Sequence, residues 1–240
     1  MIGWLAGLVL AAQFMTFAGV TLGESGSQLV ADMGEPVARS ADGTTYLYVG
    51  PGSSREVVHL TQGTVREVEL DAFQNVDPRD AAGPALLGVT LRDPESKLDA
   101  LGTSSLLGDR RVGDTRLRAY RLDASTSVAF VTSSNGNGIV SMLMTLKDGV
   151  APTNADAPPI LHSGTSFDDA IVLKAANESI GVTSEYAWLA EHPCTGGNWK
   201  VATQALVNHG APYDVLSAKC TKDAVTRDFY LNIAGFFGKT

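Results

Sequence analysis

The stretch Gly-Val-Thr-Leu at residues 19–22 occurs a second time, letter for letter, at residues 88–91. After each copy comes a short helix-like segment that ends in glycine, and then a set of strand-like runs. Self-similarity at a fixed spacing is typical of a chain built from repeated structural units. The sequence therefore predicts a tandem repeat, with one unit at residues 19–70 and the other at residues 88–146.

Local signals in the first unit predict one helix and three strands. Ser25 is a suitable helix cap, because its hydroxyl accepts from the free N–H groups of a first helical turn. Gly34 followed by Pro36 ends that helix. Runs rich in β-branched and aromatic residues, separated by glycine-containing turns, predict strands. These strands are expected at residues 44–49, 56–60 and 65–70.

The second unit gives the same order of elements. Asp93-Pro94 places a cap and then a proline in the first helical turn, and Gly102 ends the helix. Asn135-Gly136-Asn137-Gly138 tolerates positive φ and predicts a hairpin. The strands of this unit are expected at residues 117–122, 127–132 and 139–146.

Four segments are expected along the whole chain. They are a signal-like hydrophobic segment (1–18), a tandem repeat domain (19–147), a proline-rich linker (148–164) and a carboxyl-terminal α+β domain (165–240). In the last segment, helices are expected at residues 168–179 and 199–207, and strands at residues 213–219 and 227–233. The predicted fold class is α+β: a tandem helix-plus-three-strand repeat with an antiparallel sheet, followed by a smaller α+β domain.

The composition is that of an ordinary globular protein. Hydrophobic residues make up 44% of the 240 residues, which is enough to form a core. The formal net charge is −8 and the chain has no basic stripe, so nucleic acid is an unsuitable partner. The composition does not distinguish an enzyme from a binding protein.

The amino-terminal residues 1–13 have the character of the hydrophobic part of a secretory signal. The alternative is a buried first strand or helix of the fold. A membrane span needs about 20 apolar residues, and Gln13 and Thr16 interrupt this stretch, so no stable span is expected. The segment therefore indicates a periplasmic or secreted protein.

The only two cysteines are Cys194 and Cys220. In an exported protein an even pair tends to oxidise, so a disulfide between them is expected. Free buried thiols and a metal site are the alternatives. No C-x-x-C spacing is present, and no pair of histidines has the helical spacing of a zinc site, so no metal and no cofactor are expected.

The repeat resembles that of the secreted β-lactamase inhibitor proteins and of the small outer-membrane assembly lipoproteins of the BamE/SmpA type. The residues that carry the resemblance are Gly19 to Leu22, Ser25, Leu29, Gly34 and Pro36, and again Gly88 to Leu91, Leu98 and Gly102. The chain departs from the lipoproteins because it lacks their lipid-acceptor cysteine. It also has no proline after Gly102. The carboxyl-terminal segment resembles a module of uncharacterised bacterial envelope proteins, which implies no activity.

This resemblance implies a non-catalytic binding or interaction protein of the bacterial envelope, an inhibitor or an assembly factor, with a protein partner. The inhibitors bind an enzyme through a concave sheet face. Tyr46 and Tyr48 share one face of an expected strand, and they face solvent if Leu47 and Val49 face the core. Tyr120, beside Arg118, extends the same surface. Large, stiff tyrosines are good contact residues, although a sheet that packs them inward is the alternative.

The alternative function is a hydrolase or other enzyme with its site in the carboxyl-terminal domain. The candidates for acid–base work are the imidazoles and carboxylates there, around His192, His209 and Asp214, with Glu178, Glu185 and Glu191. Gly23-Glu24-Ser25-Gly26 is one residue short of the nucleophile elbow of hydrolases, and it lies where a helix cap is expected. No catalytic residue is therefore assigned, and an enzyme is the less favoured class.

Overall fold

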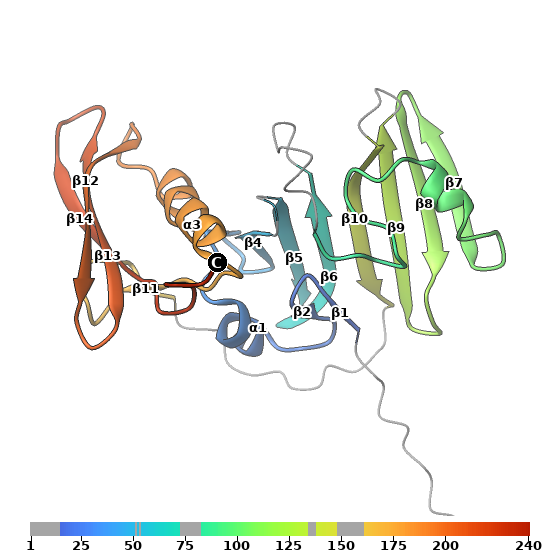
Figure 1. Ribbon diagram of the computed structural model, residues 1–240, viewed down its shortest axis with the longest axis horizontal. Coiled ribbons are helices and arrows are strands. Elements are labelled where there is room, and N and C mark those ends of the chain that lie inside the picture. The colour runs from blue at the N-terminus through green and yellow to red at the C-terminus, as the bar shows by residue number, and fades with distance from the viewer. Residues whose placement is uncertain (1–14, 51, 53, 73–82, 134–137, 148–160) are drawn as a thin grey trace, which may run out of the picture.

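The structure is a computed structural model that describes residues 15–50, 52, 54–72, 83–133, 138–147 and 161–240. The predicted α+β class is wrong, because strands make up 46% of the described chain and helices 14%. The strands form an eight-stranded and a four-stranded sheet, as Figure 1 shows. Each unit of the expected repeat has four strands in the large sheet rather than three, and the expected helix at residues 199–207 is a strand.

The large sheet consists of two antiparallel meanders that meet at their last strands. Its strands, in spatial order, are β3 (Ala38–Arg39), β4 (Thr45–Val49), β5 (Arg55–Thr61), β6 (Thr64–Asp71), β10 (Gly138–Leu146), β9 (Thr126–Ser133), β8 (Thr115–Arg121) and β7 (Leu106–Val112). The helix α1 (Gly26–Met33) precedes the first meander and the four-residue α2 (Ser96–Asp99) precedes the second. Ser25 caps α1 as expected, with its Oγ accepting from the N–H of Gln28 at 3.1 Å.

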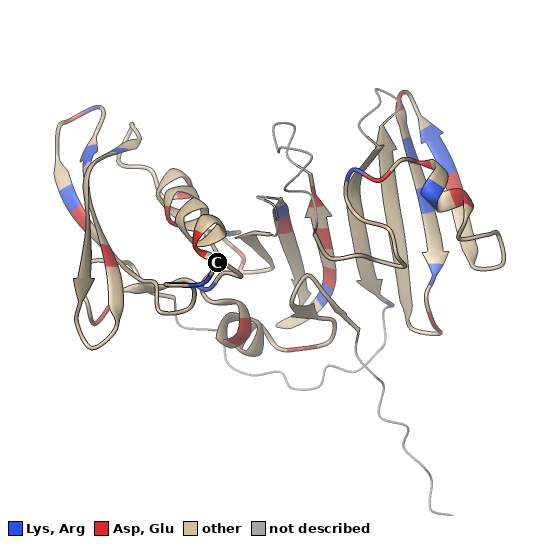
Figure 2. Cartoon of the chain, viewed as in Figure 1, with Lys and Arg blue, Asp and Glu red and all other residues tan. Residues whose placement is uncertain are grey.

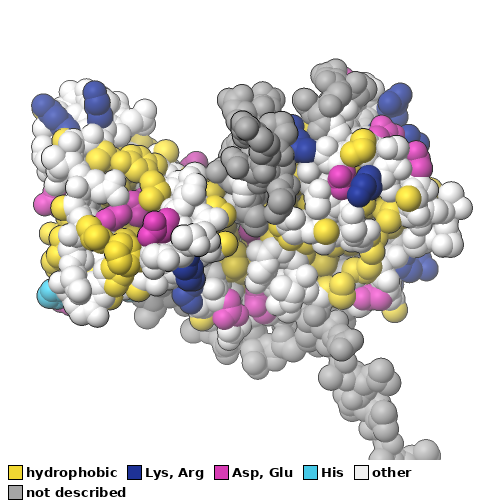
Figure 3. Space-filling model, viewed as in Figure 1, with side chains coloured by type: hydrophobic (Ala, Val, Ile, Leu, Met, Phe, Trp, Pro, Cys, Tyr) yellow, Lys and Arg dark blue, Asp and Glu magenta, His cyan; other side chains and the backbone are white. Residues whose placement is uncertain are grey.

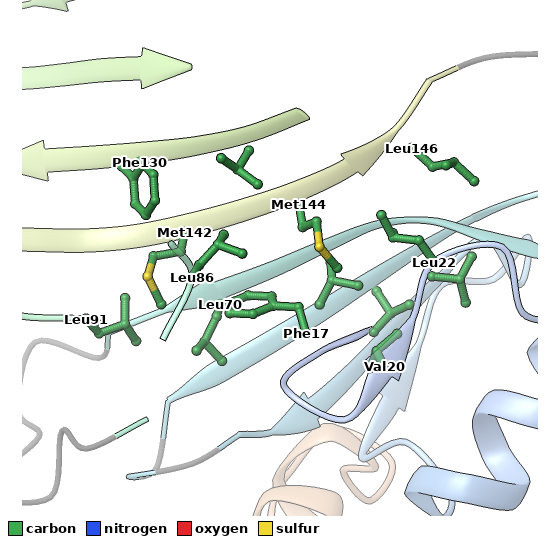
Figure 4. Packing of buried hydrophobic residues seen from close by; sticks show 14 of the residues in the cluster. Phe17, Val20, Leu22, Leu70, Leu86, Leu91, Phe130, Met142, Met144 and Leu146 are labelled. Atoms are coloured by element: carbon green, nitrogen blue, oxygen red, sulfur yellow. The ribbon is translucent and has the colours of Figure 1, made fainter. Parts of the chain in front are cut away.

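A core of apolar side chains covers one face of the large sheet. The small ribbon of β1 (Thr16–Phe17) and β2 (Val20–Thr21) closes over this core. Figure 4 shows Phe17 and Val20 of the ribbon in one cluster with Leu70, Met142 and Met144 of the sheet. Phe17 is buried, so residues 15–18 are part of the folded unit rather than of the signal-like segment in which they were expected. The rest of that segment, the turn at residues 134–137 and the linker at residues 148–160 lie outside the described residues.

The carboxyl-terminal unit is a four-stranded sheet with one helix. Its strands, in spatial order, are β11 (Ile171–Val172), β14 (Thr226–Asn232), β13 (Pro212–Cys220) and β12 (Trp199–Asn208), antiparallel except for β11 with β14. The helix is α3 (Glu178–Glu191), later than the expected 168–179. Its start is fixed by Asn177, whose side chain accepts from the N–H of Ile180 at 3.0 Å.

The helix α3 lies between the small sheet and strand β4 of the large sheet, as Figure 1 shows. Trp188 and Leu189 of α3 belong to a second core with residues of the small sheet, and Leu47 and Val49 of β4 pack against it. Strand β4 is therefore covered on both faces, by the first core and by the second.

A short backbone junction joins the two units after α1. Gly34 forms an isolated β-bridge with Leu173, and the N–H of Glu35 donates to the carbonyl of Val172 at 2.7 Å. The buried Glu35 carboxylate accepts from the N–H groups of His162 at 2.8 Å and Val172 at 3.0 Å. Gly34 has φ +82°, and a Cβ there would lie 2.7 Å from the N atom of Lys174, so only glycine fits.

No helix among the described residues is long and apolar enough to cross a membrane.

Candidate functional site

The large sheet and the small sheet together have four edge strands, and three of these are protected against pairing with another chain. Strands β3 and β11 are two residues long each. Strand β7 is longer, but Asp109, Arg110 and Arg111 place three charges along it. Short edges and charged edges are the usual means by which proteins prevent unwanted strand addition.

Strand β12 is the exception. It has ten residues, and Lys200 is its single charged residue. Its inner edge pairs with β13 along its whole length, whereas its outer edge pairs with no strand of the described chain. Most of its side chains are exposed, including Leu206 at 58%. Since an open edge presents a row of free N–H and C=O groups, β12 is a ready template for an added strand.

Apolar side chains are gathered beside this edge. Val182 and Tyr186 of α3, Leu206 of β12 and Phe237 near the carboxyl terminus are 41–58% exposed. Figure 3 shows hydrophobic side chains over this region, with acidic side chains among them. Exposed apolar side chains that gather in one place, with polar groups around them, mark interaction sites more often than single ones do.

Three of these side chains, Val182, Leu206 and Phe237, line a groove of about 180 Å³ between α3 and the small sheet. Its lining residues are Glu178, Val182, Leu206, Asp214, Ile233, Phe236 and Phe237. The close approach of the carboxyl-terminal segment to α3 depends on Gly181, because a Cβ there would lie 2.3 Å from the ring of Phe236. The groove is therefore built by the packing of three segments that are distant in sequence.

Asp214, which lines this groove, interacts with a second carboxyl group, that of Glu185. Glu185 of α3 is fully buried, and Asp214 of β13 is 7% exposed. Burial raises the pKa of Glu185 to about 9, and the charge of Asp214 and a hydrogen bond to its carboxyl act in the same direction. Glu185 therefore keeps its proton at neutral pH.

Neutral donors hold the pair in place. The side-chain amide of Gln204 donates to Asp214 Oδ2 at 2.7 Å and to Glu185 Oε2 at 3.4 Å. The hydroxyl of Tyr186 donates to Gln204 Oε1 at 3.3 Å. Glu185 Oε1 has no hydrogen-bond partner among the described residues. The pair is thus linked to both α3 and β12, the two elements that flank the groove, and Figure 2 shows acidic residues along α3.

The tyrosines expected on a contact surface are buried instead. Tyr46, Tyr48 and Tyr120 are 3%, 5% and 1% exposed and belong to the first core. The expectation that Tyr46 and Tyr48 face solvent is wrong, because the first core covers their face of β4. Leu47 and Val49 on the opposite face are covered too, by the second core. Alternation along a strand separates its two faces but does not show which of them is covered.

The hydroxyls of two of these tyrosines and the guanidinium of Arg118 have partners inside the fold. The hydroxyl of Tyr48 donates to the carbonyl of Gly34 at 3.4 Å, and that of Tyr120 donates to the carbonyl of Leu98 at 3.2 Å. Arg118 is 9% exposed and pairs with Asp99 at 2.7 Å and with Asp109 at 3.3 Å. These side chains hold helix and strand together, and none of them lies on an open surface.

The expected disulfide between Cys194 and Cys220 is confirmed, with a Cα–Cα distance of 5.9 Å. Cys220 lies at the end of β13, opposite Trp199 at the start of β12. The bridge therefore fixes the beginning of the edge strand β12 to the body of the unit.

The residues of the enzyme alternative are not brought together. His209 follows the end of β12, where its ring stacks on Phe167 at 4.4 Å. His192 lies beyond the end of α3, its ring stacked on Trp188 at 4.0 Å and its Nδ1 2.8 Å from the Trp188 carbonyl. Asp214 lies in the carboxyl pair described above. A three-residue acid–base site needs contact between its members, and these three have none.

A cleft of about 640 Å³ lies at the junction of the two units. Its polar lining includes His162, His192 and Arg227, and its aromatic lining includes Trp188 and Trp199. His162 Nδ1 lies 2.5 Å from Glu35 Oε1, so Glu35 is used to join the units. Among the described residues, no group of three or more His, Cys, Asp or Glu side chains is placed to hold a metal ion.

Asp214 and Glu185 were both among the acid–base candidates, but their pairing was not predicted. Neither the contact of this pair with Gln204 nor the groove residues Val182, Leu206 and Phe237 were predicted. One signal was available for the edge strand. Residues 199–208 contain one charge in ten residues, with several β-branched or aromatic ones, which favours a strand over an exposed helix.

No family model matches the chain, and no curated protein matches it in sequence. One solved structure with similarity to part of it is the 1.5 Å crystal structure of an extracellular protein containing an SCP domain, from Bacillus anthracis strain Ames. The identity is 12% and the TM-score 0.37, over 61% of this chain and 50% of that one. The similarity thus spans about half of that protein, and a likeness of this size transfers no function to this chain.

Proposed function

We propose that the chain is a non-catalytic binding protein that takes an extended segment of a protein partner as an additional strand beside β12. The observation that carries this proposal is the contrast among the edge strands. Only β12 is both long and nearly free of charge, while β3, β7 and β11 are short or charged. Strand addition to an open edge is a recurrent mode of peptide recognition, in which backbone hydrogen bonds supply affinity and side-chain pockets supply specificity.

The surroundings of β12 support a partner other than a second copy of this chain. The β12 edge of a second copy carries a single cation, Lys200, and would bring its own acidic groove close to the first one. Two acidic grooves do not complement each other in charge. The net charge of −8 adds repulsion between copies. The apolar side chains of Tyr186 and Leu206 beside the edge supply the kind of contact that anchors a partner.

The location that we propose is the bacterial envelope or the extracellular space. The disulfide between Cys194 and Cys220 is the supporting observation, because disulfides form and persist in oxidising compartments such as the periplasm and the secreted medium. An inhibitor or an assembly factor, as the sequence resemblance implies, fits this location.

The test changes the edge strand while leaving the fold intact. Leu206→Lys places a charge on β12 at a side chain that is 58% exposed, and Val112→Lys places the same charge on β7 at a side chain that is 62% exposed. Wild type and both variants are immobilised and challenged with a periplasmic or secreted extract, and the bound proteins are quantified. We expect a partner that binds wild type and Val112→Lys equally and binds Leu206→Lys at least tenfold less.

Two outcomes would contradict the proposal. In one, all three proteins retain the same set of extract proteins, and β12 has no role in binding. In the other, sedimentation shows that wild type forms dimers that Leu206→Lys abolishes, and the occupant of the edge is a second copy of the chain.

A further inference from the structure

The groove beside β12 has the chemistry of a site for a cation with an aliphatic stem. Two of its seven lining residues, Glu178 and Asp214, are acidic, and none of the seven is Lys, Arg or His. The remaining lining residues, Val182, Leu206, Ile233, Phe236 and Phe237, are apolar. Long basic side chains bury their methylene stem on apolar surface while the charged head meets a polar group.

Asp214 is nearly buried, and no Lys, Arg or His side chain among the described residues forms an ion pair with it. Its hydrogen bonds come from the neutral amide of Gln204 and from Glu185, which keeps its proton. A buried carboxylate is costly to keep without a counter-charge, and a paired cation lowers this cost. Glu185 Oε1 is also buried and has no hydrogen-bond partner among the described residues.

The strand register shows which residue of a bound segment would reach the groove. Leu206 of β12 lies directly opposite Asp214 of β13, so both side chains are on the same face. A residue that pairs with Leu206 in an added strand has its side chain on that face as well. Its Cα would be two strand spacings, about 10 Å, from that of Asp214, which a lysine or arginine side chain spans and a short one does not.

We propose that the groove binds the lysine or arginine side chain of the residue that pairs with Leu206 in the bound segment. This inference rests on the proposed function, because it needs a strand beside β12. The stem of the basic residue lies against Val182 and Phe237, and its charged head meets Asp214, with Glu178 at the same groove. The partner of β12 is therefore an extended segment with a basic residue between uncharged, β-favouring neighbours.

The experiment is a calorimetric titration with three synthetic peptides. The first is acetyl-Thr-Val-Thr-Lys-Thr-Val-Thr-amide; the second has norleucine in place of the lysine, and the third has the short amine 2,3-diaminopropionic acid. The proteins are wild type, Asp214→Asn and the control Glu191→Gln, which removes an exposed carboxylate at the far end of α3. Circular dichroism verifies that each variant is folded.

For wild type and Glu191→Gln we expect the lysine peptide to bind at least tenfold more tightly than the other two peptides. For Asp214→Asn we expect the three peptides to bind alike, at the affinity of the norleucine peptide. Binding of all peptides with equal affinity to wild type would leave the strand addition standing and overturn the cation site. A lysine preference that persists in Asp214→Asn would overturn it as well, and binding of none of the peptides would overturn the strand addition and the cation site together.

Discussion

At the scale of single residues, Glu56 of β5 is the most poorly accommodated side chain of the described fold. It is fully buried, and neither of its carboxyl oxygens has a hydrogen-bond partner among the described residues. Burial raises its pKa from the ordinary value of 4.5 to about 8. Burial also raises the pKa of Glu185, to about 9. Both groups are therefore neutral in the folded protein at pH 7.

These raised pKa values predict a protein that is less stable at alkaline pH. The folded state holds the proton of Glu56 over pH 4.5–8, whereas the unfolded state releases it. The stabilisation from the protonated form is complete below about pH 4.5 and is lost as the pH rises through 8. Each pKa unit corresponds to about 1.4 kcal/mol. We expect the free energy of unfolding to be lower by a few kcal/mol at pH 8 than at pH 5, as measured by urea denaturation.

The matched variants for this prediction are Glu56→Gln and Glu191→Gln. The first removes one of the two buried titrating groups and should make the pH profile less steep between pH 5 and 8, with the remaining slope from Glu185. The second removes an exposed carboxylate and should leave the profile unchanged. Carboxyl groups with a lowered pKa, such as Asp42 at about 2, change the free energy of unfolding only at more acidic pH. They therefore do not contribute to the slope between pH 5 and 8. A Glu56→Gln profile as steep as that of wild type would show that this residue is not the source.

At the scale of elements, the sequence located most strands but not the class of fold. Alternation and turn residues placed β4, β5, β6, β8, β9, β10, β13 and β14 within a few residues, because each lies between clear turn signals. β7 was missed because charged Asp109, Arg110 and Arg111 interrupt its apolar pattern. A helix was expected at residues 199–207, although the β-branched and aromatic residues of this segment favour a strand. Pairing with β13, which runs along the whole of β12, decides the outcome, and the sequence of the segment alone does not show it.

The candidate site was the harder part to predict, for the same reason. Its side chains come from α3, β12, β13 and the carboxyl-terminal segment, and the groove exists only where these pack together. Asp214 was singled out as an acidic residue, yet its role depends on the buried Glu185, 29 positions earlier in the chain. The disulfide was predictable because the chain offers a single possible pair of cysteines.

The disulfide gives a prediction for the element that it fixes. The two cysteines are separated by 26 positions, and closing a loop of this length stabilises by about 3–4 kcal/mol in the chain-entropy model. We expect the double variant Cys194→Ser, Cys220→Ser to lose about this much unfolding free energy in urea denaturation. Wild type with its disulfide reduced is the control and should match the double variant. Equal stability of the oxidised and reduced wild-type protein would contradict the prediction.

At the scale of the whole molecule, two cores share strand β4, and this arrangement leaves β12 at the outside. The large sheet carries one core on the face that β1 and β2 cover, and α3 packs on the other face of β4 (Figure 1). The Gly34–Glu35 junction ties the small sheet to this body through β11. Strand β12 lies three strands away from that attachment, with its outer edge and the groove open.

The central claim is that β12 receives an extended segment of a partner. Backbone amide hydrogen exchange, followed residue by residue with and without the lysine peptide, tests it most directly. We predict slower exchange at alternate residues of β12, where outward N–H groups gain partners, together with changes at Val182 and Asp214 and none in β7. Unchanged exchange in β12 at saturating peptide, or protection confined to the cleft around His162 and His192, would contradict the claim.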